Sequence, residues 1–217
     1  MRIEDVERFI EDEFNNFGIG SAKFPSLFIT GVADAAVHSA GVSYLLAIGL
    51  EMGLSAISEY PITLHSSDKW KRIRRVFPDS VWFHPETLQP WSAFEFERFE
   101  RGDENKVRRK VENLVLSYHQ SEENINLCVL IYWLRSGLAP RSMTPIFNTI
   151  SNGFTSKDQK VPPPRCKFLI YKFVMTESGK SSPDQNKVIK ELQGKYKNQI
   201  KSKLIVQESR KINSYTP

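Results

Sequence analysis

The chain has 217 residues, of which 40% are hydrophobic, 12% aromatic and 25% charged, which excludes two large independent domains and wholesale disorder. The net charge of +5 is uneven: residues 1–150 carry 16 basic and 20 acidic side chains, whereas residues 151–217 carry 14 and 5. We therefore expect a core with N-terminal helices over residues 1–150. We expect residues 151–217 to form a basic extension, a strand plus a helix that packs on the same core. Its positive charge would suit a polyanionic partner or form a solvated surface.

No segment predicts a membrane span or a targeting peptide. The longest apolar stretch, residues 42–50, is far shorter than the ~20 residues that cross a bilayer. The first residues are acidic with a helical period, so we expect a cytoplasmic protein. Cys128 and Cys166 lack CxxC spacing, which predicts neither a disulfide framework nor a zinc site.

The N-terminal half predicts two helices and a strand. Residues 3–17 repeat apolar side chains at helical spacing. Residues 33–52 are rich in Ala and Leu and predict a buried helix, although they include Gly41 and Gly49. The short run at residues 54–62 indicates a strand that leaves the core.

The middle of the chain predicts a hairpin, a helix and a buried strand. Two β-rich runs, residues 73–83 and 91–99, flank the turn-rich sequence HPETLQP. Residues 103–118 begin with acidic side chains and have one apolar face, as in a helix. The run INLCVLIYWL is short and apolar throughout, which is typical of a central strand covered on both faces.

The C-terminal third begins with an ambiguous segment, PIFNTIS. The run CKFLIYKFVM predicts a strand, and residues 184–206 predict a basic amphipathic helix. Taken in order, these elements predict an α/β fold with a central mixed sheet flanked by helices.

Three acidic side chains gather on the predicted hairpin. By strand alternation Asp79 shares a side with apolar residues such as Phe77, and Glu95 and Glu97 share one face, ~6–7 Å apart. Buried like charges are costly unless a metal neutralises them, and oxygen ligands suit Mg²⁺ or Mn²⁺. The alternative is a turn at Asp79 and an exposed edge strand, on which Glu95 and Glu97 pair with nearby arginines.

These motifs resemble the PD-(D/E)XK nuclease superfamily over roughly residues 33–135. The "PD" stands at Pro78 and Asp79, and the second acidic motif begins at Glu95, on consecutive strands between two helices. The resemblance implies a restriction-endonuclease-like three-layer sandwich, with Asp79 and Glu95 as Mg²⁺ ligands. It also implies a metal-dependent, endonuclease-like phosphodiesterase that hydrolyses DNA.

The third motif position departs from the superfamily, because Glu97 stands where the motif has Lys. Some members have Glu there, and in others the basic residue has moved to the following helix. The resemblance thus implies that Glu97, or else Lys106 or Lys110, positions the attacking water. Members often use a Glu from the first core helix, so Glu51 and Glu59 are candidate further metal ligands. The two lysines and these two glutamates also fit solvated surface positions.

Basic side chains supply candidate nucleic-acid contacts, in two clusters: Lys71, Arg72, Arg74, Arg75, Lys195, Lys197 and Lys201. A homodimer is expected if both strands of a duplex are cut. The alternative function is a catalytically inactive nuclease-fold module that binds nucleic acid or a protein partner.

The histidines offer no competing site. None of the four, among them His38, has metal-ligand spacing, and no GxSxG motif supports serine catalysis. We expect their roles to be structural or incidental.

Overall fold

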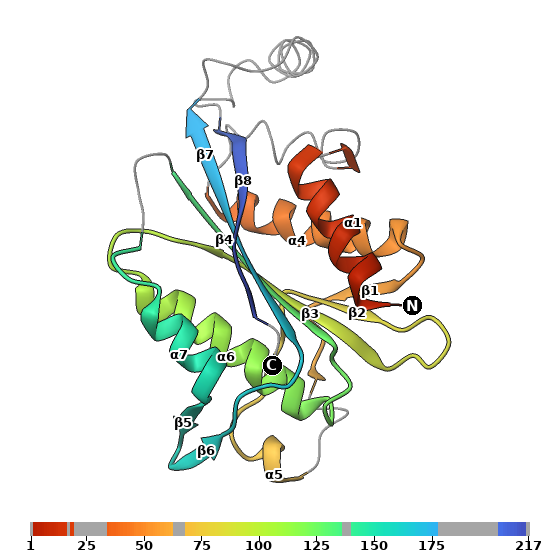
Figure 1. The fold of residues 1–217 in the computed structure, drawn as a ribbon, viewed down its shortest axis with the longest axis vertical. Coiled ribbons are helices and arrows are strands. Elements are labelled where there is room, and N and C mark those ends of the chain that lie inside the picture. The colour runs from red at the N-terminus through yellow and green to blue at the C-terminus, as the bar shows by residue number, and fades with distance from the viewer. Residues whose placement is uncertain are drawn as a thin grey trace.

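The computed structural model (Figure 1) describes residues 2–16, 18–19, 34–62, 68–135, 140–177 and 204–215. Its helices and strands, in chain order, are α1 (Ile3–Asn16), α4 (Asp34–Glu51), β1 (Ser55–Ser58), α5 (Asp68–Lys71), β2 (Ser80–Phe83), β3 (Pro90–Arg98), α6 (Glu104–Gln120), β4 (Leu127–Arg135), α7 (Thr144–Asn152), β5 (Phe154–Ser156), β6 (Gln159–Val161), β7 (Lys167–Glu177) and β8 (Leu204–Tyr215). None of the described helices is long and apolar enough to span a bilayer.

A mixed sheet forms the centre of the protein. Its strand order is β1-β2-β3-β4-β7-β8, with β3, β4 and β7 parallel and the other pairs antiparallel. Helices α1 and α4 cover one face, and α6 and α7 cover the other (Figure 1). The predicted α/β class, the β2–β3 hairpin and the sheet flanked by helices are confirmed.

Two hydrophobic cores lie on the two faces of the sheet. Phe94 and Phe96 of β3 pack with α1 and α4, whereas Ala93 packs with α6 and α7. Successive residues of β4 alternate between the two cores, and all from Leu127 to Leu134 are buried. This confirms the prediction of a central strand covered on both faces.

The two glycines of α4 let this helix lie directly on the sheet. A Cβ on Gly41 would lie 2.3 Å from Cε1 of Phe96, and one on Gly49 would lie 2.8 Å from Nε1 of Trp82. Neither position has room for a side chain. The contact of Gly41 with Phe96 also places His38, three residues earlier, beside β3.

We expect Gly41→Ala to lower the free energy of unfolding by about 1–2 kcal/mol, because overpacking against Phe96 outweighs the gain in helix propensity. Chemical denaturation would measure the change. Ser43→Ala, at an exposed position of the same helix, is the control and should change stability by less than about 0.5 kcal/mol. Equal stability of the two variants would contradict the close contact.

The C-terminal extension joins the main sheet. Residues 204–206, expected to end a helix, instead begin β8, which pairs with β7 from Glu177↔Leu204 to Phe168↔Tyr215. That part of the helix prediction is wrong, because pairing with the backbone groups of β7 outweighs a weak local helix preference. Residues 184–203 of the predicted helix lie outside the described residues.

Ion pairs connect β7 and β8 to α1. Nζ of Lys211 lies 2.8 Å from a carboxylate oxygen of Glu7 and 3.1 Å from one of Glu11. Lys167 of β7 also pairs with Glu7. These contacts join the first and last described elements of the chain.

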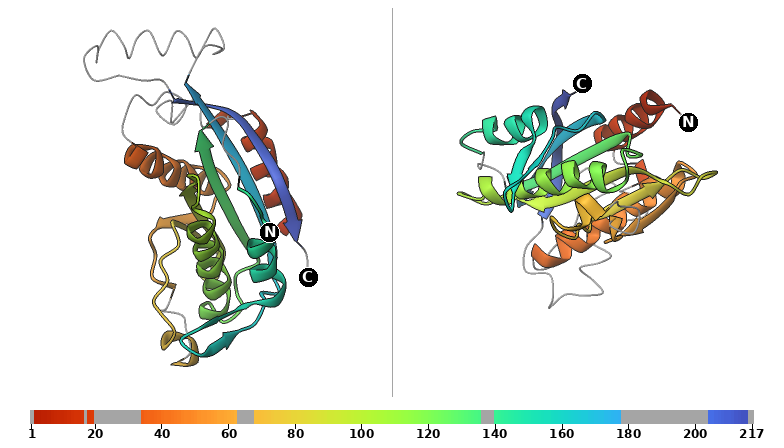
Figure 2. Two further views of the ribbon diagram at one scale, coloured as in Figure 1. Left: turned by 90° about the vertical axis from the view of Figure 1, so that its left-hand side faces the viewer. Right: turned by 90° about the horizontal axis from the view of Figure 1, so that it is seen from below.

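The β5–β6 hairpin and α5 lie at the same end of the molecule, at the bottom of Figure 1 and of the left view in Figure 2. There the side-chain amide of Gln159 donates a hydrogen bond to the carbonyl oxygen of Lys69 at 3.5 Å. The ambiguous segment before this hairpin forms α7, whose Ile146 and Ile150 pack in the core with α6.

Candidate functional site

The candidate site lies where β2 and β3 separate. Their pairing runs from Phe83↔Pro90 to Ser80↔Phe94, and Asp79 directly precedes β2. Beyond Phe94, β3 has no further register partner on this side among the described residues. On its other side it stays paired with β4 as far as Arg98↔Trp133.

Side chains satisfy the backbone groups along this open edge of β3. The Phe96 N–H donates to Oδ2 of Asp79 at 2.7 Å, and the Phe96 carbonyl accepts a hydrogen bond from Nδ1–H of His38 at 2.8 Å. Two residues further along β3, the Arg98 N–H points to the same open edge and donates to Oε1 of Glu97 at 2.9 Å. Asp79, His38 and Glu97 are thereby held at one place, with Nε2 of His38 3.7 Å from Asp79.

Lys110 of α6 connects the acidic side chains. Its Nζ lies 2.5 Å from Oε2 of Glu95, 3.2 Å from both carboxylate oxygens of Asp79 and 3.8 Å from Oε2 of Glu97. One helical turn further on, Nδ2 of Asn113 donates to Oε1 of Glu95 at 3.0 Å. Glu95 itself is completely buried. Both of its carboxylate oxygens therefore have partners from α6.

Burial and mutual charge shift the pKa values of this cluster. Burial, and then the nearby Asp79 carboxylate, raise the pKa of Glu95 well above its usual range. Burial alone would lower the pKa of Lys110, but Glu95 and Asp79 outweigh it and raise that pKa above its ordinary value. Lys110 is consequently an ammonium group at neutral pH. It can donate hydrogen bonds but cannot accept a proton.

Lys110→Met should lower the free energy of unfolding by about 3–5 kcal/mol, because it leaves buried carboxylates without their shared cation. The control is Lys106→Met. Lys106 pairs with Glu97 at 2.6 Å, but its side chain is 52% exposed against 20% for Lys110, so we expect a loss of at most about 1 kcal/mol. Urea denaturation at neutral pH would measure both, and equal losses would contradict the central role of Lys110.

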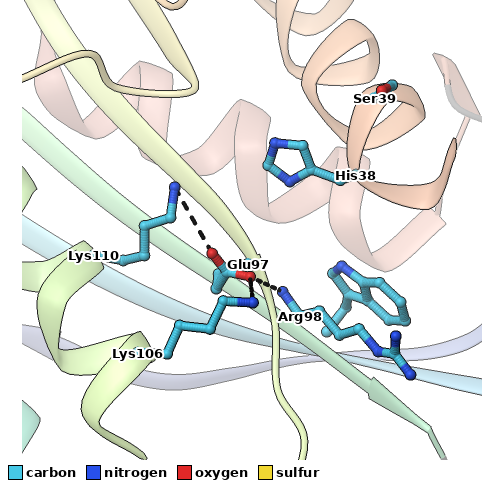
Figure 3. Close-up of a pocket in the computed structure, with 7 residues that line it drawn as sticks. His38, Ser39, Glu97, Arg98, Lys106 and Lys110 are labelled. Carbon is cyan, nitrogen blue, oxygen red and sulfur yellow. Dashed lines mark hydrogen bonds and ion pairs between the residues drawn. The ribbon is translucent and has the colours of Figure 1, made fainter. Parts of the chain in front are cut away.

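A pocket of about 510 Å³ adjoins these carboxylates, and its lining residues are His38, Ser39, Glu97, Arg98, Lys106, Lys110 and Trp133. Figure 3 shows Lys106 and Lys110 approaching Glu97 from α6, while His38 and Ser39 come from α4. The pocket lies toward the carboxyl ends of the parallel strands β3 and β4. Open α/β sheets commonly bind ligands at such ends.

Five residues singled out in the sequence come together here: Asp79, Glu95, Glu97, Lys106 and Lys110. Their chemical roles stay predictions.

Two other candidate ligands do not join this cluster. Glu51 is exposed at the end of α4, 13 residues and therefore ~20 Å along the helix from His38. Glu59 is exposed as well, and it contacts Asp79 through the backbone, since its N–H donates to the Asp79 carbonyl at 3.4 Å. The structure does not support either side chain as a metal ligand.

The predicted environment of Asp79 needs correction. The first strand of the hairpin begins at Ser80 and not at residue 73, and Phe77 is 46% exposed. Asp79 is nevertheless buried, because it accepts the Phe96 N–H and pairs with Lys110. The expected burial of Asp79 together with Val81 and Phe83 is confirmed, and only Phe77 departs from the expected pattern.

The first basic cluster is only partly available to a ligand. Arg72 and Arg75 are exposed, whereas Arg74 is half-buried and lies 3.6 Å from Glu112. Lys71 ends α5, but the placement of its side chain is not described, and three further lysines lie outside the described residues: Lys195, Lys197 and Lys201.

Three residues of the site were not predicted from the sequence: His38, Asn113 and Trp133. His38 was expected to be structural or incidental, yet it lines the pocket and contacts Phe96 and Asp79. The available signal was that His38 is the only basic side chain in the apolar helix α4. Asn113 follows Lys110 by three residues, which places both on one side of α6. Trp133 lies within an apolar strand, and nothing in the neighbouring sequence distinguishes it from the other buried residues of that strand.

Asp79 and Glu95 are the residues that could hold a hard divalent cation. Among the described residues, no group of three or more His, Cys, Asp and Glu side chains is arranged to hold a metal ion. Asp79 and Glu95 nevertheless present oxygen donors side by side, each in contact with the same ammonium group. Mg²⁺ is commonly held by one or two carboxylates together with water and substrate phosphates, so two protein ligands are sufficient.

Comparisons of the chain with protein-family models, curated proteins and solved structures return no match. What the protein does is therefore inferred from the residues of the site.

Proposed function

We propose that this protein is a metal-dependent nuclease that hydrolyses phosphodiester bonds of DNA. The observation that carries the proposal is the contact of Lys110 with both Asp79 and Glu95. The motif position for Lys is occupied by Glu97, and an ammonium group reaches the carboxylate pair from the following helix. This matches the superfamily members in which the basic residue has moved to that helix.

The order of elements supports the same proposal. Helix α4, strands β1, β2 and β3, helix α6 and strand β4 follow one another as in the resemblance to the PD-(D/E)XK superfamily. The mixed sheet with helices on both faces is compatible with a restriction-endonuclease-like sandwich.

Asp79 and Glu95 would hold Mg²⁺ or Mn²⁺. When bound, the ion would polarise the scissile phosphate and lower the pKa of a bound water. The chain's own residues arrange this pair: the Phe96 N–H fixes one oxygen of Asp79, and Asn113 fixes one oxygen of Glu95.

Lys110 would orient the attacking water and stabilise negative charge on the phosphate oxygens. Because its pKa is raised, it acts as a hydrogen-bond donor and not as a general base. Glu97 contacts both Lys106 and Lys110, which suits a role in positioning these two cations. In-line attack needs such fixed groups around the phosphate.

Asp79→Asn, Glu95→Gln and Lys110→Met should each lower the rate of metal-dependent DNA cleavage by at least about 100-fold. The assay is incubation of plasmid and single-stranded DNA with Mg²⁺ or Mn²⁺, with EDTA as the metal-free control. Glu51→Gln is the matched control, because Glu51 lies outside the cluster, and it should cleave like the unaltered protein. Circular dichroism would establish that each variant is folded. Unchanged cleavage by folded Asp79→Asn would refute the site.

A second candidate function is an inactive nuclease-fold module that binds nucleic acid or a protein partner. The observation in its favour is that the Lys110 ammonium group contacts both Asp79 and Glu95 and can itself neutralise their charge. In such a module Lys110 would be a permanent structural cation.

Thermal unfolding at rising Mg²⁺ concentration separates the two functions. For a nuclease, ion binding to the folded state should raise the melting temperature by mass action. The rise should disappear in Asp79→Asn and persist in Glu51→Gln. An unchanged melting temperature, together with DNA binding that weakens as salt increases, would favour the inactive module.

A further inference from the structure

The end of the molecule that α5 and the β5–β6 hairpin form carries a group of exposed cations (Figure 1). We call it the basic end, and its exposed basic side chains are Lys69, Arg72, Arg75, Lys157, Lys160 and Arg165. No ion pair joins any of the six to another described residue, so their charges are available to a ligand. Fewer exposed acidic side chains lie there among the described residues: Asp158 on the hairpin, and Glu122 and Glu123 after α6.

Buried contacts hold the backbone of the basic end against the last turn of α6. Gln120 is completely buried, and its Nε2 donates to the carbonyls of Trp70 at 3.1 Å and Arg74 at 2.7 Å. The Trp70 ring stacks on His119, with 4.7 Å between the ring centres. Nε2–H of His119 in turn donates to the Pro162 carbonyl at 2.9 Å. The two basic segments are therefore anchored at one place, although they are distant in the sequence.

The β5–β6 hairpin places its lysines beside α5. Lys157 and Asp158 have positive φ values of 47° and 61° and form the turn between the two strands. Such two-residue turns fit the twist of the flanking strands and keep a hairpin short. Gln159, directly after the turn, donates to the Lys69 carbonyl at 3.5 Å. The charges of the hairpin and of α5 thus belong to one continuous surface.

The basic end lies close to the carboxylates of the candidate site. Residues 75–79 run from it to Asp79, and four residues of extended chain span at most ~14 Å. Helix α6 connects the same two places: Lys110 contacts the carboxylates, and His119 lies nine residues and ~14 Å further along the helix. A DNA strand advances ~3.4 Å per nucleotide, so about four base pairs cover this distance.

The chemistry of the basic end favours phosphate groups over bases. Unstacked single strands are commonly bound on exposed aromatic rings. The rings at this end, Trp70 and Phe154, are half-buried, and each contacts a cation of its own segment or of α5: Lys69 lies 4.3 Å from the centre of the Trp70 ring, and Arg74 lies 6.0 Å from that of Phe154. Charge without exposed rings suits the backbone of a duplex.

We propose that the basic end binds the phosphate backbone of double-stranded DNA, about four base pairs from the phosphate that lies at Asp79 and Glu95. The inference rests on the proposed function for the identity of the polyanion. Binding at this surface is independent of base sequence, weakens as salt increases, and needs neither metal nor cleavage.

A hairpin variant that combines Lys157→Asn with Lys160→Gln tests the surface. Asn is chosen at position 157 because it tolerates the positive φ there. We expect the Kd for a labelled 20-base-pair duplex, measured by fluorescence anisotropy in EDTA, to rise at least about tenfold. The slope of log Kd against log salt concentration should fall by about 2, because two phosphate contacts are lost.

The matched control combines Arg2→Gln with Arg8→Gln, which removes two exposed charges from α1 on the opposite face of the sheet. It should change the Kd less than about twofold and leave the salt dependence unaltered, while thermal unfolding establishes that both variants are folded. The surface is refuted by undetectable duplex binding to the unaltered protein, by equal losses in the two variants, or by an unchanged salt dependence in the hairpin variant. A loss confined to single-stranded DNA of the same sequence would also refute it. The Asp79→Asn cleavage assay is independent, so the nuclease proposal and this surface can fail separately.

Discussion

The ammonium group of Lys110, set among buried carboxylates, is the interaction on which the site depends. Glu95 has no contact with solvent and lies beside Asp79, so the two acids repel each other unless a cation is present. Helix α6 supplies that cation because its apolar face, including Val107 and Val111, packs on the sheet and turns Lys110 toward β3. The hydrophobic packing of α6 therefore determines where the cation lies that balances the charge of Asp79 and Glu95.

The separation of β2 from β3 lets the two helical layers meet. In an uninterrupted sheet, the strands would keep α4 and α6 on opposite faces. Where β2 ends its pairing, His38 of α4 and Lys110 of α6 both reach Asp79. The polar side chains at this point also protect an open strand edge, because they occupy backbone groups that could otherwise pair with another chain.

Sequence patterns predicted the strongly periodic elements and the acidic cluster, but not how the cluster is completed. Apolar periodicity predicted the helices near residues 3–17 and 103–118, because each buries one face. A continuous apolar run predicted β4, because this strand is buried on both faces. Strand β8 was missed because its pairing with β7, and not its own composition, makes it a strand. His38 was missed because it contacts Phe96 and Asp79, which are distant in the sequence. The residue spacing within a single segment cannot reveal such contacts.

The ion pairs between α1 and β8 have a consequence for protein synthesis. Glu11 and Lys211 are 200 residues apart, whereas the elements that build the site, from α4 to β4, are complete at Arg135. At ~5–20 residues per second, the ribosome needs roughly 4–15 s more to reach Lys211. The site can thus assemble on the nascent chain while α1 still waits for its partner strand. The apolar face of α1 has earlier partners, because Phe14 packs against Tyr44 of α4 and against Tyr171 and Phe173 of β7. This face is therefore a surface for chaperones to cover only until β7 is made, whereas the ion pairs of Glu7 and Glu11 with Lys211 form last.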